Sequence, residues 1–212
     1  MSASCASNCS SDKLPADPKY RRILWIALIV NASMFGVEVV GGWTSGSAAL
    51  LADAVDFLGD AANYAVSLFV LTMAAIWRSR TAMVKGAFMG LYGLFVLATA
   101  AWHFLHGTLP KAEAMSFIAL LALTANVFVA FLLYAYRNGD SNMRAVWLCT
   151  RNDAIGNIAV LAAAAGVATT GAGWPDIAVA VVMGVLAMTG SRSVLSQARG
   201  ELRAGKDVNR RH

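Results

Sequence analysis

Acidic residues interrupt two long apolar runs of this sequence, and they are the side chains best placed to do chemistry. Asp53, Asp56 and Asp60 lie in one run, and Asp153 lies in another. A carboxylate in hydrocarbon costs roughly 2.5–3.5 kcal/mol on insertion scales, so an acid kept there is expected to have a function. The first interpretation of such an acid is an ion or proton site.

The spacing of these residues places them on shared helix faces. Positions three, four and seven apart lie on one side of a helix, so Asp53, Asp56 and Asp60 form one stripe. Cys149 and Asp153 are four residues apart and form a second stripe. Two such stripes facing each other would enclose a site with four ligands: Asp56, Asp60, Cys149 and Asp153.

Three carboxylates and a thiolate can surround a divalent metal tetrahedrally, which is the geometry that zinc prefers. Cadmium and cobalt could occupy the same cage, whereas magnesium and calcium prefer more oxygen ligands. Without metal, three neighbouring acids in a pocket of low dielectric constant cannot all stay ionised. Some would carry protons that an arriving metal releases, so the sequence predicts a site at which metal exchanges with protons.

The elements that carry these residues are predicted to be membrane-spanning helices. Of the 212 residues, 58% are hydrophobic and 14% are charged, whereas a soluble domain has about 25% charged residues. The apolar residues form runs of about 20 or more, which can cross a bilayer as helices, and these runs lack the alternation of barrel strands. We predict an all-α polytopic membrane protein with six spans: 23–43, 48–77, 82–105, 114–136, 144–170 and 175–197.

Lysine and arginine lie almost entirely on one side of these predicted spans. The N-terminal segment, the second and fourth links and the C-terminal segment are basic, and the other side has only Lys111. Both termini are therefore predicted to be cytoplasmic, and the net charge of +5 reflects this bias and not a nucleic-acid surface. We expect a disordered cytoplasmic tail (1–22), one membrane domain (23–197) and a short basic cytoplasmic tail (198–212).

The residues around both stripes resemble a known transporter family. Residues 46–56 followed by Asp60 are similar to the second span of the cation diffusion facilitators, and residues 152–157 are similar to their fifth span. The resemblance covers about residues 20–198. It implies a secondary active transporter and not an enzyme. Such a protein exports Zn²⁺, Cd²⁺, Co²⁺ or Fe²⁺ from the cytoplasm in exchange for protons, by alternating access and without a cofactor. The family pattern assigns the metal ligands as Asp56, Asp60, Cys149 and Asp153.

This sequence departs from the family pattern in three places, one of which is a short link between the fourth and fifth spans without a His-rich stretch. Cys149 stands where histidine is usual, which bears on the metal preference. The cytoplasmic metal-binding domain that usually follows the sixth span has no counterpart, so we expect a short form of the family. A homodimer would then have to form through transmembrane surfaces, or dimerisation would be lost. The expected partners are metal ions, protons and the lipid bilayer of a bacterial inner membrane or plasma membrane, with no nucleic acid.

Two other functions fit the same residues. A membrane metal sensor or partner subunit would bind ions without transporting them, and a flux measurement separates it from a transporter. An intramembrane metal-dependent transferase would also place Asp pairs on helices. However, the sequence has neither the D-G-x-x-A-R element of CDP-alcohol phosphotransferases nor the two Asp-rich loops of prenyltransferases.

Other polar residues of the runs have supporting roles by this interpretation. Glu38 and Asp53 fit a proton or ion path and bonding between helices equally well. The asparagines are expected to bond helices together, as polar side chains do in membranes: Asn63, Asn126 and Asn157.

Several residues near the ends of the runs could also take part. His103 and His106 could form an exit site or anchor the helix at the interface, and Asp176 is expected to cap its own helix or to lie at the interface. Cys5 and Cys9 could capture soft metal for the site. Arg151 either extends to the interface or pairs with an acid.

Overall fold

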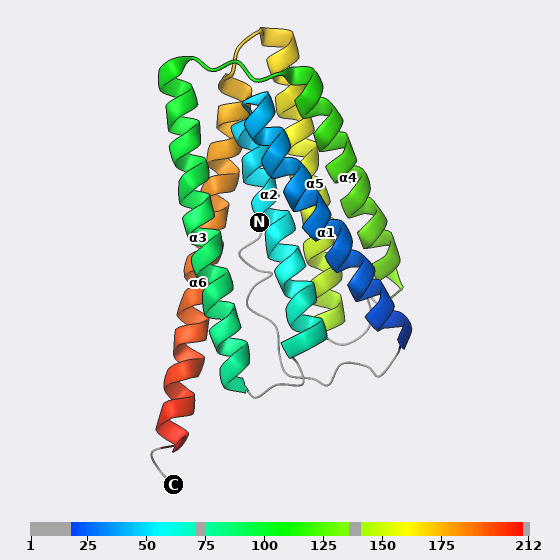
Figure 1. The fold of residues 1–212 in the computed structure, drawn as a ribbon, viewed down its shortest axis with the longest axis vertical. Coiled ribbons are helices and arrows are strands. Elements are labelled where there is room, and N and C mark those ends of the chain that lie inside the picture. Colours follow the sequence, from blue (N-terminus) through cyan, green and yellow to red (C-terminus); the bar gives the residue numbers. More distant parts are fainter. Residues whose placement is uncertain (1–17, 71–74, 136–140, 210–212) are drawn as a thin grey trace.

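The computed structural model describes residues 18–70, 75–135 and 141–209, and it is helical apart from short turns (Figure 1). Six α-helices follow one another: α1 (Pro18–Ser45), α2 (Ala48–Ala65), α3 (Ala75–His106), α4 (Ala112–Tyr134), α5 (Ser141–Thr170) and α6 (Trp174–Asn209). A short π-helix, η2 (Val66–Val70), continues α2. Some side chains within the helices are outside the description: 69–70, 75–79, 81, 85, 141–149, 151–152, 201 and 204–209.

Five of the helices contain segments long and apolar enough to cross a membrane. These segments are Pro18–Ser45, Ala82–His106, Ala112–Tyr134, Asp153–Thr170 and Trp174–Gly200. The remaining helix, α2, is 18 residues long and carries three aspartates, which lower its mean hydropathy. The prediction of an all-α polytopic membrane protein is therefore confirmed.

The predicted helix ends needed several corrections. Trp77 lies in α3, which begins at Ala75, so the predicted end of the second span at residue 77 is wrong. The apolar run shows no Gly or Pro at this point, and the sequence therefore gives no turn signal. At the other end of the chain, α6 continues to Asn209, beyond the predicted 197. Its last turns contain Arg, Glu, Leu and Ala, which are good helix formers, and no Pro.

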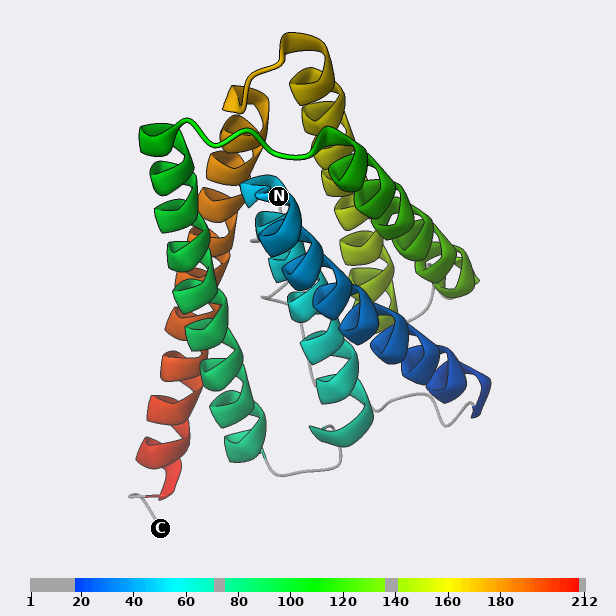
Figure 2. The same cartoon turned by 45° about the horizontal axis from the view of Figure 1, so that its top comes forward.

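Packing divides the helices into an outer pair and a larger group. The α3–α6 contact is the most extensive in the structure, and α4–α5 and α1–α2 follow. Figure 2 shows the α3–α6 pair on one side, α4 and α5 on the other, and α1 with α2 between them. Because α2 contacts α1, α3, α5 and α6, its acidic residues lie in the interior of the bundle.

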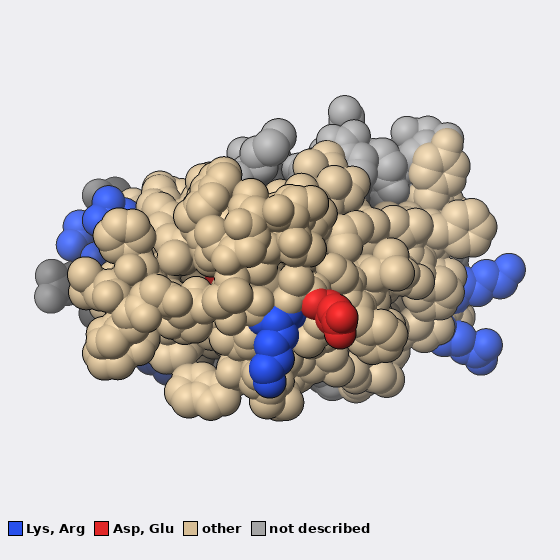
Figure 3. Space-filling model, turned by 90° about the horizontal axis from the view of Figure 1, so that it is seen from above, with Lys and Arg blue, Asp and Glu red and all other residues tan. Residues whose placement is uncertain are grey.

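The two ends of the bundle differ in charge. The start of α1, the start of α3 and the end of α6 lie at one end (Figure 1), here called the basic end. Its described cations are exposed: Lys19, Arg21, Arg22, Arg80, Arg199 and Arg203. Figure 3 looks onto the opposite end, where the described surface is mostly uncharged. This asymmetry is that of the positive-inside rule, and the cytoplasmic placement of the basic end stays a prediction.

Two hydrophobic clusters lie on either side of the acidic residues. The basic-end cluster joins α1, α2, η2 and α4 through seven buried residues: Tyr20, Leu24, Ala27, Tyr64, Leu68, Val129 and Leu133. A larger cluster extends toward the opposite end and includes Leu50, Met115 and Val167. The acids of α2 and α5 therefore lie between two apolar layers.

Candidate metal site

The first turn of α2 is fixed by a side chain from α6. Ser47 is the N-cap of α2, and its hydroxyl accepts a hydrogen bond from the Leu50 amide over 3.1 Å. Asp176 accepts hydrogen bonds from the Ser47 hydroxyl and from the amides of Ala48 and Ala49, the last two over 2.8 and 3.1 Å. Asp176 is fully buried and caps α2, so the prediction that it caps its own helix is wrong. This anchor sets the position of the acidic stripe along the bundle.

The acidic stripes of α2 and α5 face each other. The carboxyl groups of Asp60 and Asp153 lie within hydrogen-bonding distance, and Asp56 and Asp53 are close enough to Asp153 to interact with it electrostatically. Asp53, Asp60 and Asp153 are 0, 5 and 7% exposed, and Asp56 is half-buried. Four carboxyl groups so close together in an apolar interior can be satisfied by protons or by a cation.

A glycine lets α5 approach these carboxylates. A Cβ at Gly156 would lie 3.8 Å from Asp56 Oδ2 and 3.9 Å from Asp53 Oδ1. These are ordinary contact distances, so the backbone of α5 lies directly against both acids. A larger side chain at this position would fill the space between the stripes.

The predicted cage of four ligands is not assembled in the described part of the structure. Cys149 belongs to α5, but its side chain, like that of Arg151, lies outside the described residues, as do Cys5 and Cys9. Among the described residues, no group of three His, Cys, Asp or Glu side chains is arranged to hold a metal ion. The assignment of Asp56, Asp60, Cys149 and Asp153 as ligands therefore stays a prediction.

Two hydroxyl groups that the sequence analysis missed complete the surroundings of Asp60. The Tyr64 hydroxyl donates to Asp60 Oδ2 over 3.1 Å and lies 2.7 Å from Thr150 Oγ1. Thr150 is also 3.4 Å from Asp60 Oδ2. The four-residue step from Asp60 to Tyr64 could have indicated the first contact. No sequence signal indicates the second contact, because it depends on the alignment of α2 with α5.

A second polar chain joins α1, α2, α4 and α5 beside the acids. Asn126 donates to Asn157 Oδ1 over 2.8 Å, and Asn157 donates to Asp53 Oδ2. The prediction that Asn126 and Asn157 bond helices together is thus confirmed. Glu38 of α1 is fully buried within hydrogen-bonding distance of Asp53. Its two oxygens and Asp53 Oδ1 have no donor among the described groups, so a shared proton or a cation would satisfy this pair.

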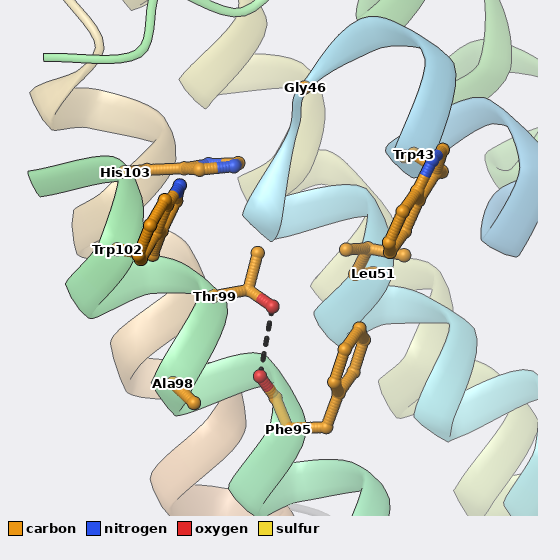
Figure 4. A pocket seen from close by; sticks show the side chains of 9 residues that line it. Trp43, Gly46, Leu51, Phe95, Ala98, Thr99, Trp102 and His103 are labelled. Atoms are coloured by element: carbon orange, nitrogen blue, oxygen red, sulfur yellow. Dashed lines mark hydrogen bonds between the residues drawn. The ribbon is translucent and has the colours of Figure 1, made fainter. Parts of the chain in front are cut away.

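The two histidines of α3 lie in different surroundings. His106 is exposed, stacks on Trp102 with ring centroids 3.8 Å apart, and bonds the Trp102 carbonyl through Nδ1. His103 lines a cavity of about 400 Å³ between α1, α2 and α3 and extends toward the turn at Gly46 (Figure 4). The other residues that line this cavity are mostly apolar, Trp43 and Phe95 among them. The arrangement does not support a shared exit site for the two histidines.

Comparison with known proteins identifies the family of this chain. The family model described as the cation efflux transmembrane domain matches residues 24–202. A cadmium, cobalt and zinc/H⁺-K⁺ antiporter of Bacillus subtilis is 24% identical over 89% of this chain and 65% of its own length. The zinc transporter ZitB of Yersinia pestis is 29% identical over 92% of this chain and 67% of its own length. The metal cation efflux system protein CzcD of Cupriavidus metallidurans is 30% identical over 77% of this chain and 56% of its own length.

The matched regions therefore span about two thirds or less of the lengths of these relatives. The family match nevertheless extends over almost all of the described helices, from Leu24 in α1 to Leu202 in α6. It includes both acidic stripes and the helices that position them. The chain is a multi-pass membrane protein that belongs to the cation efflux family.

Proposed function

We propose that this chain exports a divalent metal cation, Zn²⁺ or Cd²⁺, in exchange for protons and by alternating access. The observation that carries the proposal is the meeting of the buried acids of α2 and α5 between two apolar layers. The names of the relatives support the same cargo, because they include cadmium, cobalt, zinc and H⁺. A purely structural role would not require several carboxyl groups at one point of an apolar bundle.

In this proposal Asp56, Asp60 and Asp153 bind the metal together with Cys149. The metal is the cargo and would be held by carboxylate oxygens of α2 and α5 and by the thiolate. The thiolate favours soft ions, so cadmium would compete well with zinc. Replacing the thiol by imidazole in Cys149→His is expected to shift the preference toward zinc.

The exchange for protons follows from the same contact. In the absence of metal, a proton between the carboxyl groups of Asp60 and Asp153 would relieve their repulsion. A divalent ion that binds both carboxylates displaces that proton, and release of the ion allows a proton to return. Metal and protons would therefore occupy the site alternately.

The surroundings of the protein are part of the proposal. The basic end is placed in the cytoplasm of a bacterial cell, because positive charge favours that side. Exposed apolar side chains such as Phe117 and Phe131 of α4 would face lipid. A homodimer that forms through transmembrane surfaces would use such outer faces.

The test is a flux assay in proteoliposomes with a panel of divalent metals, with and without a pH gradient. We expect Zn²⁺ or Cd²⁺ uptake that slows when the gradient is collapsed. Asp56→Asn and Asp153→Asn should abolish it, whereas Glu113→Gln, at an exposed acid of α4, should not. Undiminished flux in either aspartate variant would reject the ligand set, and metal binding without flux would favour a sensor.

A further inference from the structure

Two hydroxyl groups form a chain that ends on Asp60. The hydroxyls of Tyr64 and Thr150 contact each other, and each also contacts the Asp60 carboxylate. The shortest of these three contacts is the 2.7 Å contact between Tyr64 and Thr150. The contact of Thr150 with Asp60, at 3.4 Å, is longer and weaker than the 3.1 Å hydrogen bond that the Tyr64 hydroxyl donates to the same oxygen. Tyr64 and Thr150 are 1 and 0% exposed. A single phenol thus connects α2 to α5 at one of the predicted metal ligands.

The ring of Tyr64 also closes the bundle toward the basic end. Tyr64 belongs to the basic-end cluster, where it packs among residues of α1 and α4 such as Leu24 and Leu133. Each of these side chains is 1% exposed or less. A cation that approached Asp60 from the basic end between α1, α2 and α4 would therefore reach the Tyr64 ring before it reached Asp60.

We propose that Tyr64 is a latch that keeps the metal-free site closed toward the basic end, and that an entering cation displaces its hydroxyl from Asp60. This inference rests on the proposed function. A carboxylate oxygen that accepts the phenol is less available to a metal, so hydroxyl and cation compete for it. Because Thr150 of α5 contacts the same hydroxyl, displacement of the hydroxyl also removes one of the contacts between α2 and α5 at the site.

Tyr64 acts through Asp60 and is therefore a positioning residue. Whether metal affinity rises or falls when its hydroxyl is removed distinguishes a latch from a supporting partner. A supporting partner would orient Asp60 for the metal, and its loss would weaken binding. Loss of a latch would strengthen binding, because the cation no longer competes with the phenol. Tyr64→Phe removes the hydroxyl and keeps the ring in the basic-end cluster.

The experiment titrates Zn²⁺ into the purified chain by calorimetry and measures initial rates of Zn²⁺ flux in proteoliposomes. For Tyr64→Phe we expect Kd and KM each to fall about fivefold, the equivalent of one hydrogen bond, with a smaller change in kcat. Thr150→Val should change Kd in the same direction. The matched control is Tyr20→Phe, a buried tyrosine of the same cluster, and it should behave like the unmodified protein.

The outcomes separate the latch from the proposed function. The latch is overturned if the Kd for Zn²⁺ rises in Tyr64→Phe and Thr150→Val, or stays within about twofold of the Kd of the unmodified protein. Asp60→Asn tests the site itself: if the unmodified protein binds no Zn²⁺, or Asp60→Asn binds it equally well, the proposed metal site fails and the latch with it. If Tyr64→Phe does not fold, Thr150→Val decides the question, because it removes the contact that holds the Tyr64 hydroxyl and leaves the Tyr64 side chain unaltered.

Discussion

Gly156 is the residue at which the spacing between α2 and α5 can be tested most directly. A Cβ there would meet Asp56 Oδ2 and Asp53 Oδ1 at ordinary contact distances of 3.8 and 3.9 Å, so Gly156→Ala should fold and bind Zn²⁺ normally. Gly156→Leu must push α5 away from the carboxylates. We expect it to weaken Zn²⁺ binding by roughly tenfold or more, measured by calorimetry.

Gly36 of α1 provides a matched control for this substitution. A Cβ at Gly36 would have no neighbour within 4 Å, so Gly36→Leu adds the same side chain where space exists. It should leave Zn²⁺ binding unchanged. If Gly156→Leu bound Zn²⁺ as well as Gly36→Leu, the close approach of α5 to the acids would have no part in forming the site.

The pair formed by Glu38 and Asp53 is a different kind of acidic site from the predicted metal ligands. Asp53 accepts a hydrogen bond from Asn157 and lies within hydrogen-bonding distance of Glu38, and both acids are fully buried. The positions of Glu38 and Asp53 in the sequence fit either a proton or ion path or bonding between helices. The contact between Asp53 and Asn157 supports helix bonding, whereas the oxygens without donors leave room for a proton.

At the scale of the helices, Asp176 has the clearest structural consequence, since it joins the start of α6 to the start of α2. Asp176→Ala would leave the Ala48 and Ala49 amides and the Ser47 hydroxyl without their buried acceptor. We expect the free energy of unfolding to fall by about 2 kcal/mol or more. Denaturation of the purified protein in detergent, followed by circular dichroism, measures it.

Glu113 is the control for this prediction, because it is an exposed acid in the first turn of α4. Glu113→Ala loses only a favourable interaction with the helix dipole, which is worth about 0.3–1 kcal/mol. Equal destabilisation by the two variants would show that the capping bonds of Asp176 do not hold α2 in place.

Local spacing was enough to predict which residues share a helix face, but not which helices touch. The steps between Asp53, Asp56 and Asp60 predicted one stripe on α2, because helical geometry fixes them; Asp53 and Asp60 are buried and Asp56 is half-buried. The capping of α2 by Asp176 joins residues about 130 positions apart and left no local signal. The turn between η2 and α3 was missed for a related reason: it lies within an uninterrupted apolar run.

In the bundle as a whole, two apolar layers enclose the acids, so the proposed passage of an ion would require the helices to move. The basic-end cluster joins α1, α2 and α4, while α3 and α6 pack mainly against each other. Relative movement of these two groups could open one end while the other stays closed. Such movement would leave the packing within each group intact and would expose the acids to one side at a time.

The charge difference between the two ends predicts how the bundle sits in the membrane. In a variant without the three native cysteines, a cysteine placed at Glu113 lies at the opposite end, and one placed at Arg203 lies at the basic end. Both positions are exposed. With the basic end in the cytoplasm, a membrane-impermeant maleimide should label Glu113→Cys in spheroplasts, and Arg203→Cys only after the membrane is permeabilised. The cysteine-free variant controls for background labelling. The reverse pattern would place the basic end outside the cell, and the proposed direction of metal transport would then have to be reversed as well.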